Sequence, residues 1–177
     1  FIGSEAGNAL ASILVGDANP SGKLPFSWMQ SLGHYGAHAL GAYPGTWRSD
    51  EKIIDEEYKE DIFVGYRWAD LHKQKPLFPF GHGLSYTTFE YVGKPRMEKT
   101  ADGSSLFTLH TSIKNTGARK GAETVQLYIR DVKSSLPRPV KELKGFQKVT
   151  LAPGEQRDIT FTIDKSMLSY YDDSKGE

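Results

Sequence analysis

Residues 106–114 read LFTLHTSIK, and this alternating stretch decides the fold class of the chain. At every second position, Phe107, Leu109, Thr111 and Ile113 fall on one face. The other face carries Leu106, Thr108, His110 and Ser112. Successive side chains of a β-strand point to opposite faces of the sheet. The pattern of period two therefore predicts a strand with one buried face.

Similar segments lie on both sides of this strand. We expect further strands at residues 87–92, 124–130, 140–151 and 158–163, separated by turn-forming runs at 115–117 and 152–155. Short alternating strands with regular turn signals predict an antiparallel β-sandwich of the immunoglobulin or fibronectin type. We count about five to six strands, whereas such a sandwich has about seven, and we expect the missing strand to follow Glu177.

A constrained joint, residues 76–89, precedes the sandwich and reads PLFPFGHGLSYTTF. Its prolines restrict φ, and its glycines permit backbone conformations that other residues avoid. Flexible linkers are polar and rich in Gly and Ser, whereas this segment is rich in apolar residues. We expect a packed, rigid joint.

The N-terminal 28 residues have a different character. Apolar residues recur at helical spacing over residues 6–14, with Ser4 as the expected N-cap and Gly16 as the terminating residue. Residues 23–28 then read as a short extended segment, in which Pro25 favours an edge position. A helix, a tight loop and a short strand form the end of an α/β unit. One such unit cannot cover its own sheet, so its partners must lie elsewhere.

The connecting stretch, residues 29–75, lacks a clear period. It begins with glycines and aromatics, continues with an acidic run over residues 50–61, and ends with an aromatic segment at 62–68 that reads as a strand. Long irregular segments inside compact domains are often functional. The aromatic content predicts a loop that packs on another surface.

Composition excludes several classes of function. The 22 basic and 22 acidic side chains balance, so the chain has no electrostatic footprint for nucleic acid. No apolar run approaches the roughly 20 residues that span a bilayer, and there is no cysteine for disulfides or thiolate chemistry. The chain starts without methionine and stops where a turn would lead to another strand, so we expect a piece of a longer protein.

Several segments in order resemble glycoside hydrolase family 3, the β-glucosidase family. Residues 5–28 (EAGNALASILVGDANPSGKLPFSW) resemble the end of its α/β-sandwich domain. Residues 58–70 and 76–91 resemble the passage into its fibronectin type III-like domain. Residues 121–131 and 134–163 resemble strands of that domain, and residues 168–172 resemble the segment before its last strand. The resemblance implies a remnant of the α/β-sandwich domain at 1–28, a connecting segment at 29–75, and a fibronectin type III-like β-sandwich at 76–177.

Family membership would imply a retaining hydrolase of terminal β-linked glucosyl residues with an aspartate nucleophile and a glutamate acid/base. Both catalytic residues lie upstream of Phe1 in the family, so no position here inherits either role. The resemblance implies no cofactor, a periplasmic or extracellular location, and the barrel and α/β-sandwich domains of the parent enzyme as partners, through which the β-glucoside is bound.

Candidate substrate contacts are aromatic, because sugar C–H faces stack on rings. The candidates are Tyr43, Trp47 and Trp68. The alternative role for these rings is to pack the loop against the sandwich. The acidic run contains carboxylates that could form the pair used by retaining glycosidases. We interpret it instead as a solvated face with local charge pairs to Lys52, Lys59 and Arg67. The histidines have no metal-ligand spacing.

A free-standing β-sandwich that binds carbohydrate or protein is the alternative function. Such a module would need an exposed row of aromatics, but Tyr128 is the only outward aromatic that the alternating strands offer. In a free-standing module, the N-terminal helix and strand would also lack packing partners. Both points favour a structural, bracing role within a larger hydrolase.

Overall fold

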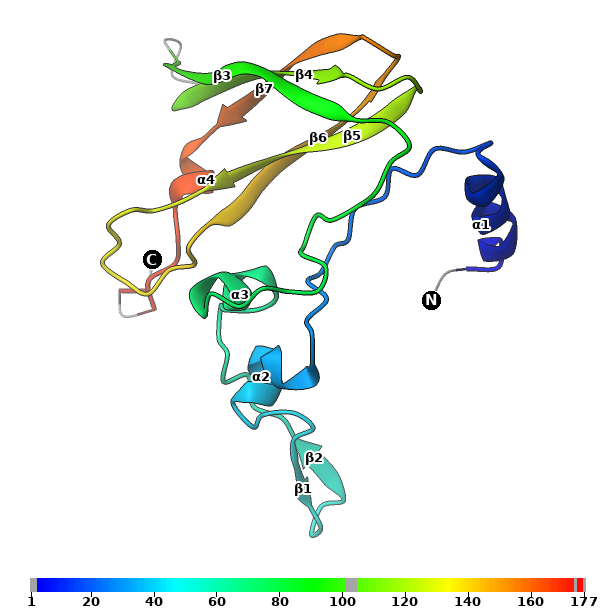
Figure 1. Ribbon diagram of the computed structural model, residues 1–177. Coiled ribbons are helices and arrows are strands. Elements are labelled where there is room, and N and C mark those ends of the chain that lie inside the picture. Colours follow the sequence, from blue (N-terminus) through cyan, green and yellow to red (C-terminus); the bar gives the residue numbers. More distant parts are fainter. Residues whose placement is uncertain (1–2, 101–104, 174, 177) are drawn as a thin grey trace. The chain divides into compact units, whose positions relative to one another are not determined.

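The computed structural model describes residues 3–100, 105–173 and 175–176, and the chain is mainly β (Figure 1). It divides into two compact units. The first comprises Phe1–Gly22, Leu84–Leu127 and Leu143–Glu177, and the second comprises Lys23–Gly83 and Tyr128–Glu142. The boundary near Gly83 falls inside the joint that the sequence singled out.

The first unit is a sandwich of two sheets (Figure 1). Strand β4 (Phe107–Asn115) is central in a three-stranded antiparallel sheet, between β3 (Phe89–Lys99) and β7 (Gln156–Ile163). The second sheet pairs β5 (Gly121–Ile129) with β6 (Glu142–Leu151). All five expected strands are present, which confirms the prediction of a β-sandwich.

The core follows the predicted alternation. In β7, Ile159, Phe161 and Ile163 are buried, while the residues between them are exposed. Ile113 of β4 and Leu151 of β6 are also fully buried. Full burial of one such side chain stabilises the fold by about 1.5–3 kcal/mol, so a few of these residues together contribute an amount comparable to the roughly 5–15 kcal/mol net stability of a domain.

Strand β3 is longer than the expected segment 87–92. The residues Gly93, Lys94 and Pro95 break the alternation, and the sequence therefore predicted that the strand would end there. The structure instead accommodates them as an irregularity between Val92 and Arg96, after which pairing with β4 resumes. An edge strand tolerates a proline and a bulge because one side of its backbone makes no ladder hydrogen bonds.

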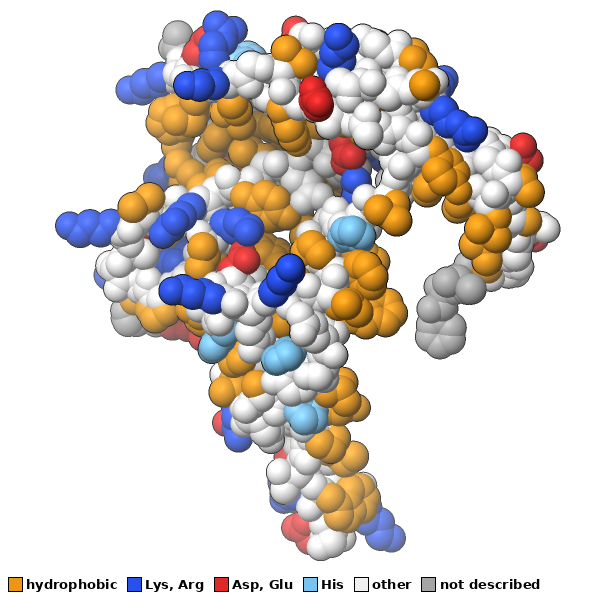
Figure 2. Space-filling view, in the orientation of Figure 1, with side chains coloured by type: hydrophobic (Ala, Val, Ile, Leu, Met, Phe, Trp, Pro, Cys, Tyr) orange, Lys and Arg blue, Asp and Glu red, His pale blue; other side chains and the backbone are white. Residues whose placement is uncertain are grey.

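The expected N-terminal helix is α1 (Ala6–Val15), and Gly16 ends it in the left-handed conformation with a φ of 87°. Ser4 as N-cap was wrong, because the cap position is Glu5, whose side chain makes no capping hydrogen bond. No residue of α1 is buried, and Leu14 and Val15 are each 73% exposed. The described residues therefore leave Leu10, Leu14 and Val15 of this helix exposed, and Figure 2 shows hydrophobic side chains at the surface of α1.

Asn19 connects the segment after α1 to the sandwich within the first unit. Its Oδ1 accepts hydrogen bonds from the Tyr86 backbone N–H (2.8 Å) and from Ser85 Oγ (3.0 Å). Its Nδ2 donates to the Lys120 carbonyl at 3.0 Å. The Tyr86 hydroxyl in turn donates to the Ile13 carbonyl at 2.8 Å. One side chain thus joins three segments that are distant in sequence.

The second unit consists of short elements. They are a 3₁₀ turn η1 (Leu32–His34), helices α2 (Gly36–Ala39) and α3 (Tyr66–Leu71), and strands β1 (Thr46–Arg48) and β2 (Ile53–Asp55). A further short helix, α4 (Lys165–Leu168), belongs to the first unit. None of the helices that the structure describes is long and apolar enough to traverse a lipid bilayer.

The prediction of a strand at residues 62–68 was wrong. Gly65 adopts a φ of 62°, which only glycine does readily, and α3 starts directly after it. Trp68 and Ala69 are the buried residues of this helix. Together with Met29 they form a small core, against which Tyr35 and Phe63 pack. Aromatics at close spacing look like a strand in the sequence, but burial of one helical face decided the structure.

The extended segment 23–28 pairs with the joint. Leu24 N–H donates to the His82 carbonyl at 2.8 Å, and Trp28 N–H donates to the Phe78 carbonyl at 2.7 Å. The bridge between Trp28 and Phe78 is antiparallel. The first half of the joint is therefore held by backbone hydrogen bonds along its length, which explains its constrained composition.

Candidate functional site

The hairpin formed by β1 and β2 presents an apolar face. Trp47 pairs across the hairpin with Ile54, and the two side chains are 59% and 55% exposed. Cross-strand partners point to the same face. Figure 2 shows hydrophobic side chains gathered on this hairpin. The indole of Trp47 is thus open to solvent beside an aliphatic neighbour.

Arg48 pairs with three carboxylates in the first half of the acidic run. Its guanidinium donates to Glu51 Oε1 at 2.5 Å and to Asp55 Oδ2 at 3.4 Å, and it lies 3.7 Å from Asp50. Lys59 pairs with Glu57 at 3.3 Å. Of the expected partners, Lys59 is confirmed, whereas Arg67 pairs with Glu142 outside the acidic run. Arg48, which was not expected, is the main partner of the carboxylates at positions 50, 51 and 55. These carboxylates neutralise a cation on an exposed turn.

Tyr43 lies in the loop between α2 and β1. Its ring is 56% exposed and lies 6.4 Å from the ring of His38. Its backbone N–H donates to the Ala37 carbonyl at 3.1 Å, which fixes the residue at the end of α2. Tyr43 and Trp47 are therefore both exposed aromatics of the second unit.

Trp68 is in a different environment. It is 7% exposed, and its ring stacks on His72 at 3.8 Å. A Cβ atom at Gly36 would lie 2.9 Å from the indole, so the ring is in close contact with backbone on another side. Trp68 packs in the core of the second unit, where it offers no open face to a sugar.

A cluster of aromatics and charges, which sequence reasoning missed, surrounds Tyr66. Its ring packs on Phe80 at 5.0 Å and, edge to face, on Tyr128 at 5.9 Å. Lys141 lies over the Tyr128 ring at 5.7 Å and pairs with Asp70 at 3.0 Å. Burial raises the pKa of the Tyr128 hydroxyl, assisted by the neighbouring Tyr66 and Asp70.

This arrangement connects residues 66–70 to residues 128–142, together with an ion pair between Arg67 and Glu142 at 3.5 Å. Tyr128, expected to face outward, packs on another ring instead. The sequence contained no signal for these contacts, because they join segments about sixty residues apart. The cluster is structural, because it attaches the end of β5 and the loop that follows it to α3.

Comparison with known proteins decides the family. The description "Glycosyl hydrolase family 3 C-terminal domain" matches residues 1–86, and "Fibronectin type III-like domain" matches residues 123–177. Over 177 residues and 99% of this chain, 47% of positions are identical to β-glucosidase BoGH3A of Bacteroides ovatus. The chain belongs to glycoside hydrolase family 3.

Solved structures agree with this membership. A family 3 β-glucosidase of Bifidobacterium adolescentis superposes with a TM-score of 0.84 at 35% identity, over 97% of this chain and 24% of that one. A β-D-glucoside glucohydrolase of Trichoderma reesei gives a TM-score of 0.81 at 32% identity, over 98% and 25%. This family 3 chain covers 23% of the length of the Bacteroides relative and 22% of thermostable β-glucosidase B of Acetivibrio thermocellus.

Three histidines of this family 3 chain make local contacts. His34 Nδ1 lies 3.4 Å from Ser31 Oγ, His72 Nδ1 lies 3.1 Å from the Trp68 carbonyl, and the His82 ring stacks on Phe78 at 5.2 Å. Within the described part of the chain, no three His, Cys, Asp or Glu residues gather as a metal site would require.

Proposed function

We propose that this chain is the C-terminal part of a retaining β-glucosidase that hydrolyses terminal, non-reducing β-D-glucosyl residues. The observation that carries the proposal is the 47% identity to a β-glucosidase along 99% of the chain. The thermostable β-glucosidase of Acetivibrio thermocellus supports it with 47% identity over 172 residues. Such identity over nearly the whole chain, through both matched domains, favours the same parent architecture.

In this proposal the chain is structural and braces catalytic domains that lie outside it. The hairpin carboxylates of Glu51 and Asp55 pair with Arg48. We place the nucleophile and the acid/base in the catalytic domains outside this chain. The exposed side chains Leu10, Leu14 and Val15 of α1 form the face that docks on the remainder of the α/β-sandwich domain. The domains divide at 1–28, 29–75 and 76–177.

Tyr43 and Trp47 are the proposed points of contact with substrate, since both rings are exposed on the second unit. Trp68 supports them from the core, without touching a sugar. In the full-length enzyme, Trp47→Ala should raise KM several-fold with little change in kcat, as expected when ground-state binding is lost. Phe146→Ala, which removes an exposed ring of the first unit, is the matched control.

The proposal is tested with a chromogenic aryl β-glucoside. The full-length gene product should release the chromophore, while the 177-residue chain should be inactive. Co-expression of the chain with the upstream part of the gene product should restore turnover. Hydrolysis by the chain alone, or a full-length protein inactive on β-glucosides but active on another glycoside, would contradict the proposal.

A further inference from the structure

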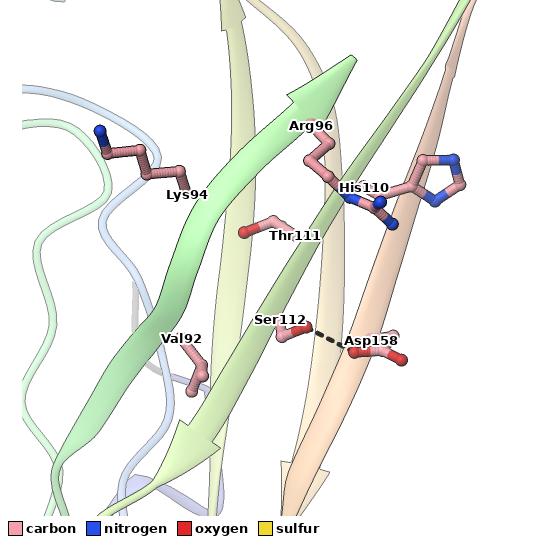
Figure 3. Close-up of a pocket in the computed structure, with 7 residues that line it drawn as sticks. All are labelled: Val92, Lys94, Arg96, His110, Thr111, Ser112 and Asp158. Atoms are coloured by element: carbon pink, nitrogen blue, oxygen red, sulfur yellow. Dashed lines mark hydrogen bonds between the residues drawn. The ribbon is translucent and has the colours of Figure 1, made fainter. Parts of the chain in front are cut away.

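Strand β3 bulges away from β4 and opens a pocket on the three-stranded sheet. Val92 pairs with Ser112 and Arg96 with His110, so residues 93–95 of β3 stand opposite Thr111 alone. Gly93 has a φ of 74° and open space around it. The resulting hollow has a volume of about 240 Å³ and is lined by Val92, Lys94, Arg96, His110, Thr111, Ser112 and Asp158 (Figure 3).

The register brings polar side chains together at this pocket. Ser112 faces Asp158 across the β4–β7 ladder, and His110 faces Arg96 on one side and Thr160 on the other. Figure 3 shows Arg96, His110, Ser112 and Asp158 on the same side of the sheet, whereas Lys94 and Thr111 point the other way. Four side chains from three strands therefore share one surface.

Hydrogen bonds orient part of this group. Ser112 Oγ donates to Asp158 Oδ1 at 2.5 Å, and His110 Nδ1 lies 3.2 Å from Thr160 Oγ1. Among the described residues, the second carboxylate oxygen of Asp158 and the Nε2 atom of His110 have no hydrogen-bond partner. The pocket thus holds an oriented acceptor and an oriented imidazole side by side.

The guanidinium of Arg96 has no hydrogen-bond or ion-pair partner among residues 3–100, 105–173 and 175–176. It supplies a fork of donors that matches a carboxylate in geometry and charge. The face is not broadly cationic, because Glu98 lies two residues after Arg96 on β3 and Glu90 lies opposite Lys114 in the β3–β4 register. Recognition of a long polyanion is therefore disfavoured, and a single anionic group is favoured.

The required ligand carries one carboxylate for Arg96 and hydroxyl groups for Asp158 and His110. The volume of about 240 Å³ lies below the roughly 300–1,000 Å³ of pockets for drug-sized ligands, which favours a single sugar ring. We propose that this pocket binds an acidic saccharide residue of the hexuronate class. The proposal is independent of the proposed β-glucosidase function, because it involves only β3, β4 and β7.

The test is an NMR titration of the ¹⁵N-labelled chain with D-glucuronate, D-glucose and sodium sulfate at constant ionic strength. Glucuronate should shift the amide signals of residues 92–96 and 110–112 in a saturable manner. Glucose lacks the carboxylate and sulfate lacks the hydroxyls, so each should cause much smaller shifts. Equal binding of sulfate and glucuronate, binding of glucose as strong as that of glucuronate, or no saturable shift at these residues would overturn the proposal.

Two variants and a control sharpen the result. Arg96→Gln should weaken glucuronate binding about tenfold or more, as expected for loss of a charge-assisted bidentate contact. Asp158→Asn should weaken it as well, through the hydroxyl contacts. Arg157→Gln removes the neighbouring arginine of β7, which pairs with Glu155, and should leave the affinity unchanged. Unaltered amide spectra outside the pocket verify that each variant folds. Unchanged affinity in Arg96→Gln would refute the assignment.

Discussion

Asn115 makes four hydrogen bonds inside the sandwich, and its replacement offers a quantitative test. Its side chain is fully buried at the end of β4. Oδ1 accepts hydrogen bonds from Thr87 Oγ1 (2.6 Å) and from Gly117 N–H (3.1 Å). Nδ2 donates to the carbonyls of Arg119 (2.8 Å) and Leu151 (3.0 Å). The amide therefore connects β4 to the joint, to the following turn and to β6.

The expected magnitude follows from these partners. Asn115→Ala leaves the Leu151 carbonyl and the Thr87 hydroxyl buried and without their partner. Each such group costs about 1–3 kcal/mol, so the loss should be about 4 kcal/mol. That is a large part of the roughly 5–15 kcal/mol that holds a domain folded. Thr87→Val removes a single hydroxyl of similar shape and should cost only about 1 kcal/mol.

Guanidinium denaturation followed by far-ultraviolet circular dichroism measures the effect, because the β-sandwich dominates that signal. The midpoint should fall by roughly 1 M for Asn115→Ala. The three tryptophans lie in the second unit, so their fluorescence separately reports that unit. Asn8→Ala, at an exposed position bonded to Glu5, is the matched control. A loss below about 1 kcal/mol for Asn115→Ala would refute the reasoning.

Two further predictions concern packing and pH. A Cβ at Gly121 would lie 2.6 Å from Thr87 Cγ2, so Gly121→Ala should destabilise the chain by about 1–3 kcal/mol, whereas Gly22→Ala, with open space around it, should be neutral; equal thermal midpoints for both variants would contradict this. The Ser166 hydroxyl, followed by a backbone N–H of α4, lowers the pKa of Asp164. The Asp164 carboxyl group therefore binds its proton less tightly in the folded state than in the unfolded state. Its ionised form stabilises the fold fully above the ordinary aspartate pKa, and this contribution is lost as the pH falls through the lowered pKa of the folded state. Asp164→Asn should consequently be less stable than the wild type at neutral pH and equally stable in acid, and a stability difference that persists in acid would argue against this account.

The sandwich strands were predictable because their signal is local. In β7 the buried Ile159, Phe161 and Ile163 alternate with exposed residues, and burial of one sheet face requires this period. Gly16 was predictable for a similar reason, since a left-handed residue at the end of a helix strongly favours glycine. Local rules failed at residues 62–68, where packing of Trp68 against Met29 selected a helix.

The candidate sites were less predictable. Exposed and buried aromatics look the same in a sequence. Trp47 and Trp68 were therefore equal candidates for substrate contact, although Trp47 is 59% exposed and Trp68 is 7% exposed. The pocket at β3 had no sequence signal, because Gly93 and Pro95 read as the end of a strand. Its side chains come from residues as far apart as Arg96 and Asp158.

The class of fold, the position of most strands and the family could be read from the amino-acid sequence, because alternation, turn residues and motif order are properties of neighbouring residues. Three-dimensional contacts were needed to establish which rings are open, which carboxylates pair with Arg48, and that Asn115 has four hydrogen-bond partners. Those features depend on cross-strand register and on contacts between distant segments. Such contacts are set by the burial of the whole core, and no local pattern encodes them.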